Sequence, residues 1–149
     1  MTTREFINKT IGTESPKTRS CSRVFTDERG TVYSYGYHYP LARIIDGIGF
    51  INDRGYSSTT ARHIYWADRA LGEKIGYANV YRIPLTNGNS LTLFGMKESA
   101  EREIDRLNDL LVSKKRTNTW VYENLTISRD NTLKALQAVE ELISGKVLI

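Results

Sequence analysis

Two tight-turn signals lie close together in the first third of the chain, and each separates runs of β-forming residues. Asp27 and Gly30 occupy the first and last positions of a four-residue turn, in which glycine takes the left-handed conformation that closes the turn. Asp46-Gly47 is a two-residue hairpin turn, because both residue types accept positive φ. Connections this short join only antiparallel strands. The sequence therefore predicts a meander of four strands, at residues 23–26, 31–35, 41–45 and 48–51.

Helical signals follow the meander. Four hydroxyl residues, 57–60, offer N-caps for a run of helical periodicity that continues to Leu71, and Gly72 follows as a stop. Residues 97–115 form a longer amphipathic pattern with acidic residues early and lysines late. Ser128 is expected to cap a final helix. Between these helices the sequence predicts a second hairpin, at 79–85 and 90–94, and a last strand at 119–125.

The order of these signals predicts an α+β fold. We expect an antiparallel meander sheet with one short helix and two longer C-terminal helices packed on it. Residues 1–20 are polar and show no sustained period, so they are expected to form a flexible or irregular arm in which residues 5–11 dock as a helical turn. Residues 21–149 are then expected to form a single α+β domain.

Composition limits the class of partner. The net charge of +4 and the pI of about 9.2 favour anionic partners. No apolar run approaches the roughly 18 residues that a membrane span needs, so we expect a cytoplasmic protein without a membrane partner, in the host cytoplasm if the chain is viral. One cysteine and two histidines show no metal-ligand spacing, and no dinucleotide or phosphate-loop motif occurs. We therefore expect no metal and no cofactor.

The predicted helix start near residue 59 is a candidate anion site. A helix N-terminus presents free amide groups and the positive end of the helix dipole. Hydroxyl and guanidinium groups crowd this one, and the candidate ligand-binding residues are Arg54, Ser58, Thr59, Thr60 and Arg62. A phosphate group fits such a site. The alternative is that the Ser/Thr run only caps the helix.

Aromatic residues on both sides of this helix start suggest stacking. Residues 33, 35, 37 and 39 are all tyrosine, so in a continuous strand they would share one face, and Tyr35 is a candidate ligand-binding residue. A wet face of tyrosines beside arginines would stack bases, whereas a buried one would be core. Along the helix, Arg62, Trp66 and Arg69 fall on one stripe, which suits a nucleotide or an acidic partner.

His38 and His63 allow a catalytic alternative. His63 lies in the first turns of the helix, where the dipole favours a neutral ring. If both histidines converge over the helix start, they could act as acid and base on a phosphodiester with Arg62 holding the phosphate. The competing interpretation is a half-buried His63 that is hydrogen-bonded by a neighbouring backbone group or tyrosine hydroxyl.

Two segments carry a resemblance. The pattern Tyr-Ser-Tyr-Gly-x-His-Tyr-Pro over residues 33–40, followed by Tyr-Ser-x-Thr-Thr-x-x-His over residues 56–63, resembles small uncharacterised proteins encoded by phages and plasmids. The resemblance implies a bacteriophage or mobile-element context and a shared site. Small viral proteins of this size often bind host machinery or nucleotides to blunt defence, so host takeover or anti-defence is the setting that we expect.

These observations lead to three functional hypotheses. The first is a protein that binds a nucleic acid or a nucleotide phosphate. The second is a metal-independent phosphodiesterase or nuclease that uses His38 and His63. The third is an inhibitor that binds a host defence protein through Trp66 and the arginine stripe. The late helices could also serve a homo-oligomer interface.

Overall fold

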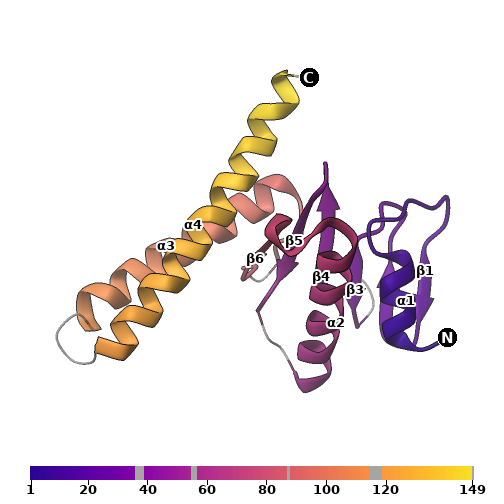
Figure 1. The fold of residues 1–149 in the computed structure, drawn as a ribbon, viewed down its shortest axis with the longest axis horizontal. Helices are drawn as coiled ribbons and strands as arrows, with labels where there is room; N and C mark the ends of the chain where they lie inside the picture. Colours follow the sequence, from indigo (N-terminus) through magenta and orange to yellow (C-terminus); the bar gives the residue numbers. More distant parts are fainter. Residues whose placement is uncertain (36–38, 55–56, 87, 115–118, 149) are drawn as a thin grey trace. The chain divides into compact units, whose positions relative to one another are not determined.

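The computed structural model describes residues 1–35, 39–54, 57–86, 88–114 and 119–148 (Figure 1). Within it the chain divides into two compact units, Met1–Tyr81 and Arg82–Ile149. The first of these units includes the N-terminal residues, and the single domain expected over residues 21–149 stays a prediction.

A six-stranded sheet, whose first five strands lie in the first unit and whose last strand crosses the boundary at Tyr81, has its strands in sequence order. The strands are β1 Arg19–Cys21, β2 Val24–Thr26, β3 Val32–Ser34, β4 Tyr39–Ile45, β5 Ile48–Asn52 and β6 Val80–Ile83. Neighbouring strands from β1 to β5 pair antiparallel, which confirms the predicted four-strand meander as β2 to β5. The whole sheet is mixed, not purely antiparallel, and a helix connects β5 to β6.

Both predicted hairpin turns are present. The Asp27 carboxylate accepts hydrogen bonds from the amides of Arg29 (2.9 Å) and Thr31 (3.0 Å), and Gly30 has a φ of +84°. Asp46 and Gly47 have φ angles of +48° and +78°, as a two-residue hairpin turn requires. These turns set the register of the meander.

Helix α1, Thr3–Thr10, lies in the segment that was expected to be an irregular arm. The side chain of Thr2 caps it by accepting a hydrogen bond from the amide of Glu5. Phe6, Ile7 and Ile11 are buried in the core of the unit. The apolar face spans fewer than two helical turns, which is too short for a helical period to be recognised in the sequence. Residues 1–20 therefore contribute α1 and β1 to the fold.

Helix α2, Ser58–Ile75, packs on the sheet through the stripe that the sequence predicted. Thr60, Ile64, Ala67 and Leu71 are all buried. The helix is longer than predicted, because it continues through Gly72 and ends at Gly76, which has the positive φ of +87° typical of a helix C-cap. A short 3₁₀ helix, η1 Tyr77–Asn79, follows.

Helices α3, Leu93–Lys114, and α4, Thr119–Leu148, pack along each other in the second unit (Figure 1). The predicted strands at 90–94 and 119–125 are wrong. Thr92 caps α3 by accepting a hydrogen bond from the amide of Gly95, so the first run leads into a helix. In the second run, half-buried Val121, Tyr122 and Leu125 fit helical spacing as well as strand alternation. Asn87, in the predicted turn, lies outside the described residues.

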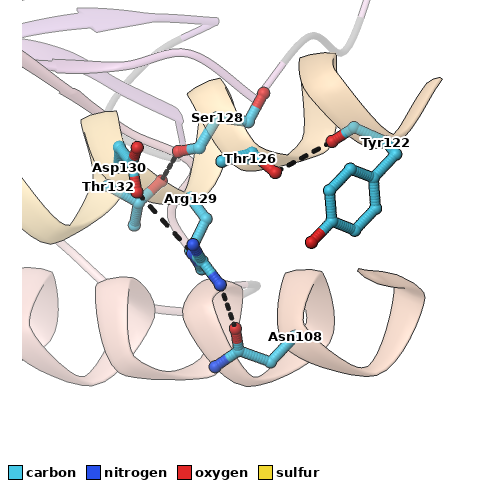
Figure 2. Close-up of polar contacts among 7 residues, drawn as sticks. All are labelled: Asn108, Tyr122, Thr126, Ser128, Arg129, Asp130 and Thr132. Atoms are coloured by element: carbon cyan, nitrogen blue, oxygen red, sulfur yellow. Dashed lines mark hydrogen bonds and ion pairs between the residues drawn. The ribbon is translucent and has the colours of Figure 1, made fainter. Parts of the chain in front are cut away.

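A polar group lies between these two helices (Figure 2). Arg129 on α4 donates to the side-chain oxygen of Asn108 on α3 at 3.4 Å, and its Nε lies 3.7 Å from the Asp130 carboxylate. Thr126 and Thr132 donate their hydroxyls to backbone carbonyls one turn earlier in α4. Across the described ranges of the chain, no helix combines the length and apolar composition needed to cross a bilayer.

Candidate functional site

The start of α2 is set by one serine. Ser57 is the N-cap, in an extended conformation, and its Oγ accepts a hydrogen bond from the amide of Thr60 at 3.1 Å. The same Oγ lies 3.1 Å from Oγ1 of Thr60, to which it donates. A helix that begins this way makes no internal use of the amides of its first two residues, Ser58 and Thr59. Those amides point out of the helix start, where they can meet an anion.

Tyr35 connects this helix start to the sheet. It follows β3 with a φ of +57°, and its amide donates to the carbonyl of Arg23 at 2.8 Å. Its hydroxyl oxygen lies 3.3 Å from Oγ of Ser57. Hydrogen bonds with Ser57 and Thr59 lower the pKa of the Tyr35 hydroxyl, with a smaller contribution from Arg23. The guanidinium carbon of Arg23 lies 5.5 Å from the centre of the Tyr35 ring. Through this contact Tyr35 holds a positive charge close to the start of α2.

His63 lies beneath this site, in the interior. Its Nδ1 is 2.9 Å from the hydroxyl of buried Ser34, and only 5% of the residue is exposed. Burial lowers the pKa of His63, and the charges of Arg62 and Arg23 lower it further. The ring is therefore neutral at pH 7, as predicted, although burial is the main cause and not the helix dipole. The contact with Ser34 supports the structural interpretation of His63, with a serine as the partner.

Two exposed cations approach the site from different elements. Arg23 lies between β1 and β2, and Arg62 lies in the first turns of α2. Both charges lower the pKa of His63, and the contact of Arg23 with the Tyr35 ring brings its guanidinium group toward the helix start. We refer to Arg23, Tyr35, Ser57, Thr59 and Arg62 as the α2 amino-terminal cluster.

The other predicted site residues lie in different surroundings. Thr60 is fully buried and its hydroxyl is engaged by Ser57, so it belongs to the cap and not to a binding surface. Ser58 is exposed at the helix start. Arg54 is exposed, and its charge acts on the hydroxyl of Tyr39 in β4. The structure therefore brings only part of the predicted set together.

The predicted stripe of Arg62, Trp66 and Arg69 is only partly exposed. Trp66 is half-buried against the core, and its ring centre lies 5.8 Å from that of His63. Arg69 is exposed and donates to the hydroxyl of Tyr65 at 3.1 Å. Tyr65 is the exposed aromatic residue on this side of α2. Trp66, the next residue, points in a different direction around the helix axis and faces the sheet.

The tyrosines of residues 33–39 do not form one continuous strand. β3 ends at Ser34 and β4 begins at Tyr39, so Tyr33 and Tyr39 belong to different strands. Tyr33 donates its hydroxyl to the Asp27 carboxylate at 3.1 Å, and burial followed by Asp27 raises its pKa to about 12. Tyr37 and His38 lie outside the described residues. The alternation of tyrosines in the sequence therefore does not place Tyr33 and Tyr39 on one face of a single strand.

Sequence reasoning missed Arg23, Ser34 and Tyr65. The first two could have been found from the predicted turn at Asp27 to Gly30. That turn pairs Val24 with Ser34, which places Arg23 opposite Tyr35 in the same register. Tyr65 is one turn before Arg69 on α2, a spacing at which side chains meet.

Comparison with known proteins gives one match. A family model described as a family of unknown function (DUF8033) matches residues 7–81. No curated protein and no solved structure matches the chain. The matched segment contains every residue of the α2 amino-terminal cluster. Within the described ranges, no group of histidine, cysteine and acidic side chains could hold a metal ion.

Proposed function

The chain belongs to the DUF8033 family of unknown function through residues 7–81, and we propose that this segment binds the phosphate of a nucleic acid or nucleotide at the α2 amino-terminal cluster. The observation that carries the proposal is the contact of Arg23 with the Tyr35 ring, whose hydroxyl lies against the Ser57 cap of α2, the helix that carries exposed Arg62 in its first turns. The second unit, Arg82–Ile149, which contains helices α3 and α4, lies outside the matched segment.

Three features of the cluster favour a phosphate, namely outward amides, the helix dipole and guanidinium groups. The outward amides of Ser58 and Thr59 supply fixed donors, and the helix dipole adds positive potential. Arg23 and Arg62 supply guanidinium groups, whose planar arrangement of donors matches phosphate oxygens. The charges of Arg23 and Arg62 come from separate elements, so an anion between them would be contacted from two sides.

The aromatic ring of Tyr35 favours a nucleotide over a simple anion. It is half-buried, with one contact to Arg23 and another to the cap, so its position is fixed before a ligand arrives. A base or sugar attached to the bound phosphate can pack on such a ring. The resemblance to phage and plasmid proteins supports a mobile-element setting, in which nucleotide or nucleic-acid binding would serve host takeover or anti-defence.

Binding is tested by titrating the ¹⁵N-labelled full chain with inorganic phosphate, AMP and a dodecameric oligothymidylate at about 50 mM salt. We expect the amide signals of Ser58 and Thr59 to shift most. Arg23→Ala and Arg62→Ala should each weaken binding about tenfold, the effect of losing one charge-assisted contact. Arg29→Ala, which removes an exposed arginine from the β2–β3 turn, is the matched control and should bind like the wild type. Equal losses in all three variants would indicate non-specific attraction and contradict the proposal.

The nuclease hypothesis has less support. It requires His63 to act on a phosphodiester, yet this side chain is buried and its Nδ1 faces Ser34. The other candidate, His38, lies outside the described residues. EDTA-resistant cleavage of the oligonucleotide that His63→Gln abolishes would restore it.

The inhibitor hypothesis gives a different result. It predicts that none of the three phosphate-containing probes binds. It also predicts that Trp66→Ala leaves the circular dichroism spectrum unchanged while abolishing capture of a host protein.

A further inference from the structure

A second exposed group of side chains continues along α2 from the amino-terminal cluster. Tyr65 and Arg69 lie one turn apart, and the Arg69 guanidinium donates to the Tyr65 hydroxyl at 3.1 Å. The guanidinium carbon also lies 5.8 Å from the centre of the Tyr65 ring. Tyr65 is 54% exposed, so this arginine holds the ring in place without covering it.

Tyr77 extends the same surface beyond the end of α2. Its charge interaction with Arg69 raises the pKa of that arginine, after the larger effects of Tyr65. A Cβ atom added to Gly72 would come within 2.1 Å of the Tyr77 ring, so the ring rests directly on the helix backbone at this glycine. Even so, Tyr77 is 56% exposed. Its ring is fixed on one side and open on the other. We refer to Tyr65, Arg69 and Tyr77 as the outer strip.

The outer strip lies in line with the proposed phosphate site. Arg62, Tyr65 and Arg69 follow one another at helical spacings of three and four residues, so they share one side of α2. Arg62 and Arg69 are seven residues apart, which corresponds to about 10 Å along the helix. Tyr65 and Gly72, which carries the Tyr77 ring, have the same separation. Cations and open rings therefore alternate along about three turns of helix.

We propose that the outer strip binds single-stranded nucleic acid, with bases stacked on Tyr65 and Tyr77 and backbone phosphates at Arg62 and Arg69. This inference rests on the proposed function and names its ligand class. A mononucleotide would fill the amino-terminal cluster and leave the strip empty, whereas a strand reaches both. Stacking needs open rings held in place, and it works with any base because every base has a flat face.

A duplex fits this surface less well. Its bases are stacked on one another and cannot lie on Tyr65 or Tyr77. The strip also has an acidic neighbour, Glu73, whose charge acts on Arg69. Glu73 would oppose a rigid phosphate backbone, whereas a flexible strand can place its phosphates at Arg62 and Arg69.

The test is fluorescence anisotropy with labelled oligothymidylates of 2, 6 and 12 nucleotides and a 12-base-pair duplex. We expect affinity to rise from 2 to 12 nucleotides and to exceed that for the duplex. Tyr65→Ala and Tyr77→Ala should each weaken binding of the 12-mer about tenfold, the effect of losing one stacked base. Phe94→Ala removes an exposed aromatic ring from α3 and is the matched control. Tyr65→Phe keeps the ring and should retain most of the affinity.

The outcomes separate this inference from the proposed function. If Tyr65→Ala and Tyr77→Ala bind the 12-mer like the wild type while Arg23→Ala weakens it, the outer strip is not the strand site and the phosphate site stands. If no oligonucleotide or nucleotide binds the wild type, both fail. If Tyr65→Ala loses a protein partner but keeps oligonucleotide affinity, the strip serves that partner and the inference is overturned. Circular dichroism of each variant reports whether it is folded.

Discussion

The hydroxyl oxygen of Tyr35 lies 3.3 Å from Oγ of Ser57, across 22 residues of sequence. This contact joins the end of β3 to the N-cap of α2. A second contact, at 2.9 Å between the hydroxyl of Ser34 and Nδ1 of His63, joins the same two elements. Both contacts fix the helix start relative to the sheet, so the orientation of the outward amides depends on neighbours outside α2.

Ser57→Ala should destabilise the first unit by about 1 kcal/mol, and by up to about 2, because it removes the N-cap acceptor and the Tyr35 contact together. The measurement is urea unfolding followed by the fluorescence of Trp66 in a Trp120→Phe background, since the chain has two tryptophans. Ser58→Ala, at the exposed first helical position, is the control and should change stability by a few tenths of a kcal/mol. Similar losses for both serines would contradict the assignment of Ser57 as the cap.

His63 should make the protein less stable in mild acid. Burial, Arg62 and Arg23 lower its pKa in the folded state below the ordinary value of about 6.5. The unfolded chain then takes up a proton that the folded chain resists. Stability is therefore full above pH 6.5 and is lost as the pH falls through 6.5 toward the lowered folded pKa.

The pH effect is measured as the difference between two proteins. His63→Gln keeps a hydrogen-bonding side chain beside Ser34 but does not titrate. Urea midpoints at pH 7.5 and pH 5.5 should fall more for the wild type than for His63→Gln. His38 and the carboxylates are present in both proteins, so their contributions cancel. Equal falls in the urea midpoints of the two proteins would mean that His63 accepts the proton as readily in the folded state as in the unfolded chain.

The sequence predicted the parts of the fold that depend on local chemistry. The turns at Asp27 to Gly30 and Asp46-Gly47 specify their own geometry through positive φ, so the meander follows directly. Gly72 misled the prediction of where α2 ends, because a glycine can serve a close contact as well as a stop. Its place under Tyr77 depends on the chain folding back, which no local pattern contains.

The site was predicted less completely for a related reason. Arg62 and the start of α2 could be identified because capping and the dipole act within one turn. Trp66 was placed on an exposed stripe, but the width of the buried face depends on what packs against the helix. Arg23 depends on pairing across a hairpin, so it needs the strand register as well as the residue type.

Tyr33 should stabilise the protein at neutral pH and lose that effect in alkali. Its hydroxyl donates to the Asp27 carboxylate, and burial and Asp27 raise its pKa to about 12, above the unfolded value of 10. The stabilisation is full below pH 10 and is lost as the pH rises from 10 toward 12. Tyr33→Phe should therefore be about 1 kcal/mol less stable than the wild type at pH 8. Urea unfolding should show a smaller difference in stability between the two proteins at pH 10.5. An equal difference at both pH values would contradict the role of the hydrogen bond from Tyr33 to Asp27.

Gly30→Ala should be much more destabilising than Gly47→Ala, although both glycines have positive φ, +84° and +78°. Gly47→Ala should lose only the stability that alanine costs in the left-handed backbone conformation, about 1 to 2 kcal/mol. No described atom lies within 4 Å of the added Cβ. At position 30 the Cβ would lie 2.5 Å from the backbone nitrogen of Thr13, in the segment that follows α1. That backbone is held by a hydrogen bond from the amide of Gly12 to the carbonyl of Gly30 at 2.9 Å, so it cannot move without breaking the bond. Urea unfolding of the two variants measures the difference, and equal losses would show that the connection between α1 and β1 yields to the added methyl group.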